Sequence, residues 1–161
     1  MFSSTSSVVK VNPFDVYNTV LTNFTSIKNL ACFSNYTAIP PNDLITISNI
    51  TMDCVDKLSE MSILFIKKIH DSNVSVSTIE KLHEMKKIHD ELIGYINKFN
   101  LISSNISDRF TEICANNLNQ EAINYIYYDI INRHKLIVFQ IFDSIKRINI
   151  YIGLVKDKIN L

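Results

Sequence analysis

Apolar residues recur every three or four positions along most of the chain, which is the spacing that places them on one face of an α-helix. The first such stretch begins near Asn12-Pro13 and continues to Ala31. Asn accepts hydrogen bonds from the free N–H groups at a helix start, and Pro suits the first helical position. Two prolines in a row do not continue a helix, so we expect Phe33–Pro41 to be a loop.

A second stretch with helical periodicity lies between Asp43 and His70. Its clearest part is Asn49–Ile69, where apolar residues form one stripe and most charged residues fall elsewhere. Residues 44–50 are rich in Ile, Thr and Ser and are also compatible with an extended segment. The polar run Asp71-Ser72-Asn73 is expected to end the helix.

The third stretch, Ser77–Phe99, has the most regular apolar stripe in the chain. Ser77 and Glu80 have the spacing of a capping box, and Ser75 is an alternative cap. We expect this helix to end within Asn100–Asn105.

Two helices are expected in the remainder of the chain. The shorter one covers about Ser107–Leu118, and the longer one covers Glu121–Ile159, which contains no proline and one glycine. The longer helix is apolar on nearly every side, so we expect the other helices or a partner to surround it. If this helix is kinked, Asn132 and Gly153 are the expected positions.

These patterns predict an all-α protein, a bundle of about five helices with a long, largely apolar C-terminal helix. Residues 136–142 and 148–155 are also β-branched and aromatic enough for strands, but no glycine or proline turn separates them. We expect residues 1–11 to be a mobile tail and residues 12–161 to form a single helical domain.

Composition excludes several classes of protein. The 161 residues include only two glycines and three prolines, too few for the tight turns of a β-sandwich or for glycine loops that hold phosphates. The net charge is zero, which argues against a nucleic-acid-binding protein. The 26 isoleucines, 18 asparagines and excess of lysine over arginine are typical of AT-rich genomes, including those of large DNA viruses and other pathogens.

Targeting signals and cysteines indicate the compartment in which the protein is expected. The first residues lack the basic and apolar regions of a secretory signal, although an export signal for a specialised bacterial system is an alternative. No apolar run is long enough to predict a membrane span. Cys32, Cys54 and Cys114 lack the spacing of a zinc site or a disulfide framework. We therefore expect an intracellular, reducing compartment such as the cytoplasm, including that of a host cell.

The sequence shows no set of residues with a recognisable catalytic or metal-binding spacing. Glu80 and His83 form a single Glu-x-x-His motif, whereas a di-iron bundle needs two such motifs and further carboxylates. We expect no cofactor, no bound metal and no enzymatic activity. An enzyme that uses cysteine or histidine chemistry without a recognisable motif is an alternative.

The C-terminal segment carries the candidate interface. Tyrosine has an apolar body and a polar tip, which makes it a frequent anchor residue in interfaces. His134 falls on the apolar stripe, where it is either a hydrogen-bonded core residue or a group at an interface edge. The candidate interface residues are Tyr125, Tyr127, Tyr128, His134, Phe139, Phe142 and Tyr151.

These observations predict a non-enzymatic helical protein–protein interaction module, such as an adaptor, regulator or inhibitor, that binds a protein partner or forms a homo-oligomer. One alternative is a structural subunit of a larger helical assembly. Another is a viral regulator built like the Bcl-2 proteins, although the Asn-Trp-Gly-Arg stretch of that family is absent here. A central helix wrapped by the others would favour the latter.

Overall fold

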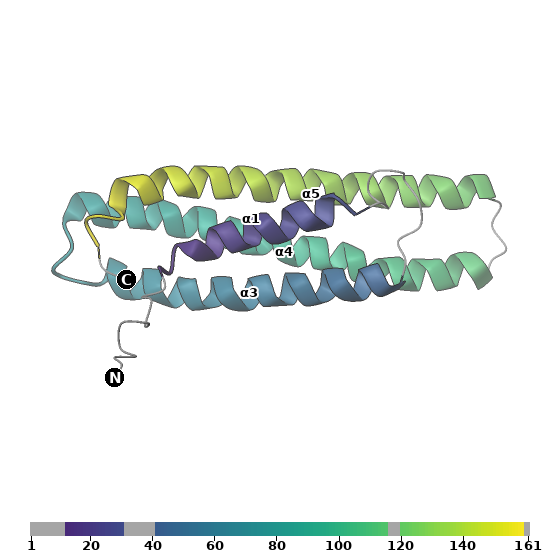
Figure 1. The fold of residues 1–161 in the computed structure, drawn as a ribbon, viewed down its shortest axis with the longest axis horizontal. Coiled ribbons are helices and arrows are strands. Elements are labelled where there is room, and N and C mark those ends of the chain that lie inside the picture. Colours follow the sequence, from purple (N-terminus) through teal and green to yellow (C-terminus); the bar gives the residue numbers. More distant parts are fainter. Residues whose placement is uncertain (1–11, 31–40, 116–119, 160–161) are drawn as a thin grey trace, which may run out of the picture.

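The fold is an elongated bundle of helices that lie side by side (Figure 1). The computed structural model describes residues 12–30, 41–115 and 120–159, and these contain helices and their connections but no strand. The helices are α1 (Asp15–Lys28), α3 (Pro41–Ile69), α4 (Val76–Ala115) and α5 (Gln120–Val155). The prediction of an all-α bundle is confirmed.

The four helices form a ring around a shared core. The short α1 packs against α3 and α5 on one side of the bundle, and α4 packs against the same two helices on the other side (Figure 1). Side chains of α1 and α4 meet across the centre, where the rings of Phe24 and Phe99 stack edge to face at a centroid distance of 5.4 Å. All four helices therefore contribute to one apolar cluster.

The described residues hold four helices where about five were expected, because the expected third and fourth helices are one. α4 runs for 40 residues, from Val76 to Ala115, through the expected break at Asn100–Asn105. Asn and Ser favour caps and turns but, unlike Pro, they do not block a helix. Ser103 is buried here, and its hydroxyl donates to the carbonyl oxygen of Phe99 in the preceding turn at 3.0 Å.

The C-terminal helix ends earlier than expected, and more of its surface is exposed. α5 is a single helix of 36 residues that continues through Asn132 and ends at Val155, ahead of the predicted end at Ile159. It contains both segments that were also compatible with strands. α5 is not surrounded by the other helices, since one of its faces remains exposed.

Local hydrogen bonds lie where two helices begin. α1 begins at Asp15, two residues after the predicted start near Asn12-Pro13, and the side chain of Asn12 accepts a hydrogen bond from the backbone N–H of Phe14 at 3.0 Å in the turn before the helix. At the start of α4, Ser75 Oγ accepts the N–H of Thr78 at 3.2 Å. Ser75 is therefore the cap, whereas Ser77 lies within the helix and accepts a hydrogen bond from Lys81.

We predict that Ser75→Ala lowers the free energy of unfolding by about 1 kcal/mol, because the N–H of Thr78 loses its acceptor. Urea unfolding followed by circular dichroism measures this change. Ser77→Ala is the matched control and should change stability by less than about 0.5 kcal/mol. Equal losses in both variants would contradict the assignment of the cap.

Candidate functional site

α5 has two apolar faces on opposite sides of the helix. At about 100° per residue, six exposed apolar side chains fall within an arc of about 80°. They are 50% to 73% exposed. We call them the outer stripe: Tyr125, Tyr128, Leu136, Phe139, Ile150 and Leu154.

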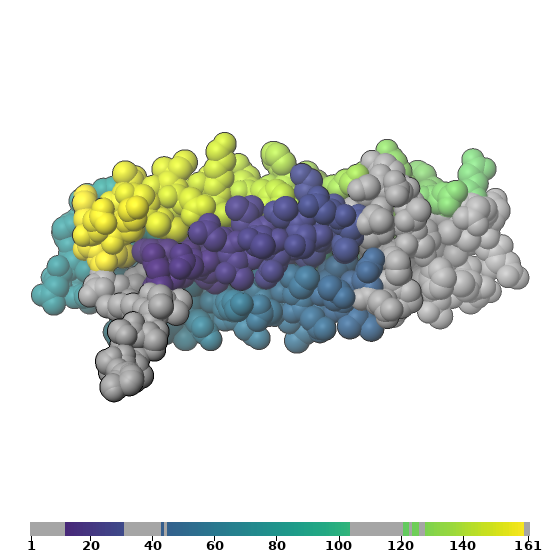
Figure 2. Space-filling view, viewed as in Figure 1, coloured from purple at the N-terminus to yellow at the C-terminus, as the bar shows by residue number. Residues whose placement is uncertain are grey.

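The opposite face of α5 is buried in the core, where it carries Ile137, Ile141, Ile145 and Ile148. α5 forms the upper edge of the molecule in Figure 2, and its outermost side chains project away from α1 and α3. A helix at the surface of a bundle ordinarily needs one apolar face. The outer stripe is therefore apolar surface that folding of the monomer does not use.

Polar residues divide the outer stripe into three apolar pairs. Asn132 separates the tyrosine pair from Leu136 and Phe139, and the exposed Asp143 and Lys146 precede the pair Ile150 and Leu154. Charged residues also flank the stripe. Arg133 pairs with Asp129 at 3.1 Å, and Arg147 pairs with Glu91 of α4 at 3.4 Å.

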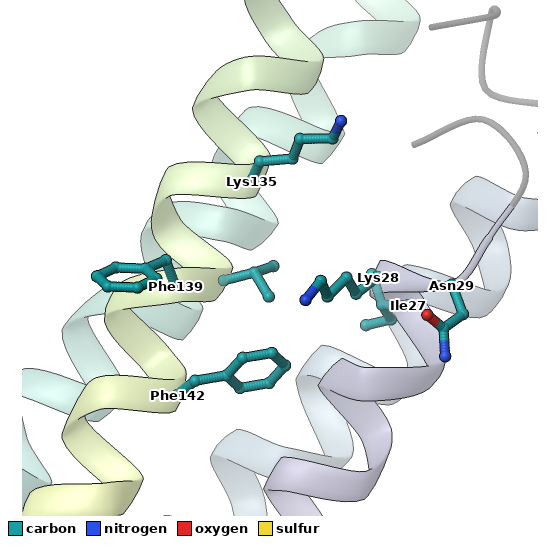
Figure 3. Close-up of a pocket in the computed structure, with 7 residues that line it drawn as sticks. Ile27, Lys28, Asn29, Lys135, Phe139 and Phe142 are labelled. Atoms are coloured by element: carbon teal, nitrogen blue, oxygen red, sulfur yellow. The ribbon is translucent and has the colours of Figure 1, made fainter. Parts of the chain in front are cut away.

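A hollow of about 400 Å³ lies beside the outer stripe, between the end of α1 and the middle of α5 (Figure 3). The Lys28 ammonium lies 5.8 Å from the centre of the Phe142 ring, which is a cation–π distance. Phe142 points toward α1, whereas the ring of Phe139 points away from it (Figure 3). The described lining residues are Ile27, Lys28, Asn29, Lys135, Val138, Phe139 and Phe142.

The predicted interface residues are not all on one surface. Three of them lie on the outer stripe: Tyr125, Tyr128 and Phe139. Phe142 and Tyr151 are half-buried and pack against the core. The side chain of Tyr127 lies outside the described residues.

Three stripe residues were missed by the sequence prediction: Leu136, Ile150 and Leu154. Their positions share the same arc of the helix as Phe139, so the 100° spacing would have grouped them. Other helices of the bundle do not cover these three positions, which face away from it, so the alternative of a surrounding partner stays a prediction.

The structure places His134 inside the bundle rather than on a surface. Its side chain is 0% exposed, and its ring meets the ring of Phe99 edge to face at 4.5 Å. Nδ1 lies 2.9 Å from the carbonyl oxygen of Ile130, and Nε2 lies 2.9 Å from Ser103 Oγ. Since a carbonyl only accepts, Nδ1 carries the hydrogen and Nε2 of the neutral ring is an acceptor. The single hydroxyl hydrogen of Ser103 is shared between this nitrogen and the carbonyl oxygen of Phe99.

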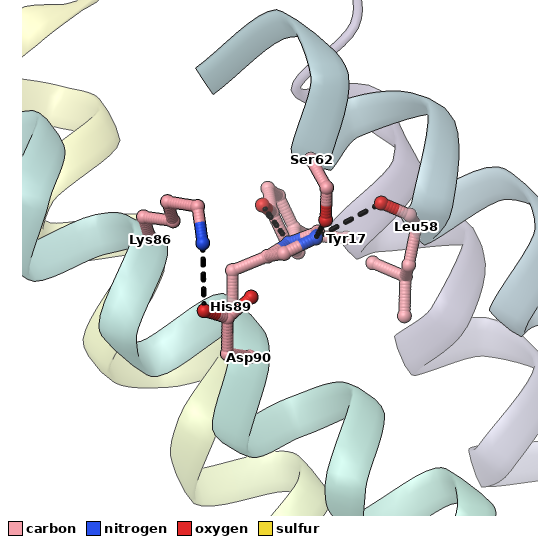
Figure 4. A network of polar contacts seen from close by, with 6 residues as sticks. All are labelled: Tyr17, Leu58, Ser62, Lys86, His89 and Asp90. Carbon is pink, nitrogen blue, oxygen red and sulfur yellow. Dashed lines mark hydrogen bonds and ion pairs between the residues drawn. The ribbon is translucent and has the colours of Figure 1, made fainter. Parts of the chain in front are cut away.

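A second buried histidine, His89 of α4, joins three helices (Figure 4). Nε2 of His89 lies 2.9 Å from the carbonyl oxygen of Leu58 in α3, so Nε2 carries the hydrogen. Nδ1 then accepts from the hydroxyl of Tyr17 in α1 at 2.7 Å. The core position of His89 was not predicted from the sequence, although it lies four residues after Met85 and three before Leu92 on the inward face.

Ser62 and His89 lie at the distance seen in catalytic serine–histidine pairs, because Ser62 Oγ is 2.7 Å from His89 Nε2. A base must present an unprotonated nitrogen to the serine hydroxyl. Here Nε2 is the protonated nitrogen, because it faces the Leu58 carbonyl as well. The arrangement therefore holds Ser62 as an acceptor and does not activate it.

Burial sets the protonation of these groups. It lowers the pKa of both His89 and His134 to about 4 and raises the pKa of the Tyr17 hydroxyl. Burial also raises the pKa of the Cys54 thiol, which is fully enclosed and lies 3.5 Å from the side-chain nitrogen of Asn23. Near pH 7 all four groups are uncharged.

Metal ligands do not gather in the described part of the chain, where no group of three His, Cys, Asp or Glu side chains could hold an ion. His83 and Glu80 are both on the outward side of α4, and His83 is exposed. The side chains of Cys32 and Cys114 lie outside the described residues. Among the described helices, none is long and apolar enough to cross a bilayer.

Comparisons of this chain with models of protein families, with curated proteins and with solved structures gave no match.

The two buried histidines predict a stability that falls in acid. Their folded pKa of about 4 lies below the ordinary 6.5, so the unfolded chain binds more protons between these values. The contribution of each histidine to the free energy of unfolding is fully present above about pH 6.5. It decreases by about 3 kcal/mol per histidine as the pH falls toward 4.

Unfolding by urea at a series of pH values tests this prediction. His89→Gln and His134→Gln should each reduce the slope of unfolding free energy against pH between about pH 6 and about pH 4.5. The exposed His83→Gln is the control and should leave the slope unchanged. A slope that is the same in all four proteins would contradict the assigned protonation.

Proposed function

We propose that this protein is a non-enzymatic protein–protein interaction module and that the outer stripe of α5 is its binding surface. The observation that carries the proposal is the pair of opposite apolar faces on α5, of which the bundle buries one. The stripe from Tyr125 to Leu154 is about 44 Å long at about 1.5 Å per residue. An exposed apolar surface of this length is typical of a helix that docks on another helix or in a groove.

The size of the stripe sets what a partner must supply. Six side chains that are about half exposed can contribute roughly 1 kcal/mol each when they are buried, or roughly 6 kcal/mol together. Association costs on the order of 4 to 15 kcal/mol in lost freedom of movement. The partner therefore has to bury apolar surface of its own, so we expect it to be another protein with a matching apolar face.

The chemistry of the core supports a non-enzymatic role. His89 and His134 are enclosed and neutral, with their hydrogens directed at backbone carbonyls. The Cys54 thiol is enclosed and protonated, so it is a poor nucleophile. A buried, reduced thiol also fits the reducing, intracellular compartment that we propose for this protein, and the net charge of zero favours a protein partner over nucleic acid.

A structural subunit of a larger assembly is a second candidate, and α3 gives a specific reason for it. Four exposed apolar residues share an outward face of α3: Ile45, Met52, Ile63 and Ile66. A subunit with neighbours on two sides would use both this face and the outer stripe. The ring of four helices also differs from the wrapped central helix that a Bcl-2-like regulator requires.

We predict that Phe139→Asp abolishes partner binding, because a carboxylate is placed in the middle of the outer stripe. Ile63→Asp on α3 is the matched control, since Ile63 is 67% exposed and Phe139 is 68% exposed. Both changes should alter the free energy of unfolding by less than about 0.5 kcal/mol. The measurement is a pull-down from an extract of the source cells with each protein as bait, with proteins identified by mass spectrometry.

Loss of the same bound proteins with Phe139→Asp and not with Ile63→Asp is the expected result. Loss with Ile63→Asp alone would move the binding surface to α3. Retention of all bound proteins by both variants would contradict the proposed function.

A further inference from the structure

The outer stripe carries two opposite charges between Phe139 and Ile150. Asp143 and Lys146 are three residues apart and exposed, and neither forms an ion pair within the described residues. Apolar residues of the stripe lie on both sides of them. The charges are therefore placed where a partner would have to match each of them.

The part of the outer stripe from Leu136 to Leu154 matches itself when its direction is reversed, and the tyrosine pair lies outside this match. The midpoint between Ser144 and Ile145 lies equally far from Asp143 and Lys146, and also equally far from Phe139 and Ile150. If a second copy is turned about a two-fold axis through this midpoint, its α5 runs antiparallel to the first. Asp143 of each copy then lies opposite Lys146 of the other, and Phe139 lies opposite Ile150.

The next residues along the stripe continue the match, because Leu136 comes within one position of Leu154 of the second copy. The apolar layers and the two ion pairs thus coincide in a single register. A parallel arrangement would instead place Asp143 against Asp143 and Lys146 against Lys146. Like charges in contact oppose association, so the charge pattern favours the antiparallel orientation.

We propose that the partner of the outer stripe is a second copy of this chain, paired through α5 in this antiparallel register. This inference rests on the proposed function, since it names the occupant of the same surface. The paired segment, Leu136–Leu154, is about 27 Å long. One helix seam of this length is smaller than the roughly 800 Å² per partner of a standard interface, so the dimer is reversible and micromolar or weaker.

Exchange of the two charges tests the register directly. Sedimentation equilibrium at low salt should show a monomer–dimer equilibrium for the unchanged protein. Asp143→Lys and Lys146→Asp should each weaken it at least about fivefold, because two attractions become repulsions. The double variant should dimerise like the unchanged protein. An equimolar mixture of the two single variants should also dimerise, since a lysine of one copy then faces an aspartate of the other at both pairs.

A matched control uses the outward face of α3. Asp56→Lys makes the same change of charge at an exposed position of α3 and should leave the dimer unaffected. The antiparallel register would be overturned if the charge changes on α5 left the dissociation constant of the dimer unchanged. It would also be overturned if the equimolar mixture of the two single variants failed to dimerise.

The outcomes also separate this inference from the proposed function. A chain that stays monomeric at millimolar concentration, but loses a different bound protein with Phe139→Asp, overturns self-pairing and leaves the binding surface in place. A dimer that persists in Phe139→Asp, together with unchanged capture of all bound proteins, overturns both, because association would then use another surface.

Discussion

Only one side of a helix at the edge of a bundle can face the core, and α5 is apolar on two sides. Its inward side packs on α4 and α1, which fixes its rotation about its own axis. The outer stripe is turned to solvent as a direct consequence. The exposed surface is therefore tied to the core: a rotation of α5 that hid Phe139 would expose the fully buried Ile141 and Ile148.

Buried hydrogen bonds add specificity to this packing. His89 links α4 to Tyr17 of α1 and to the Leu58 carbonyl of α3, and His134 links α5 to Ser103 of α4. An apolar core tolerates small shifts between helices, whereas a buried polar group that loses its partner costs about 1 to 3 kcal/mol. These two histidines thus hold the helices in one register and keep the outer stripe aligned along a single edge.

Much of the fold was predictable from the sequence, because helical periodicity and the scarcity of glycine determine it. The failure at Asn100–Asn105 has a physical reason: local preference for a turn was outweighed by burial of Ser103 and its bond to Phe99. Periodicity identifies faces within a helix but does not tell which of two apolar faces will be covered. That choice depends on how many helices surround α5.

The candidate surface was predictable only in part, because periodicity does not tell which apolar face stays exposed. Tyr125, Tyr128 and Phe139 were predicted as interface residues from their residue type, because aromatic side chains are typical of interfaces, and all three are exposed on this surface. His134 shares the periodicity of α5, but its partner Ser103 is 31 residues away in sequence, and contacts of this separation appear only once the helices are packed.

The central claim is that the outer stripe becomes covered when the protein binds its partner. Hydroxyl-radical footprinting, read by mass spectrometry, measures side-chain exposure at single residues in the dilute protein and in the associated one. We expect oxidation of Leu136, Phe139 and Ile150 to fall on association, while oxidation of Met52 and Ile63 on α3 stays unchanged. Protection of the α3 residues with unchanged oxidation along α5 would contradict it.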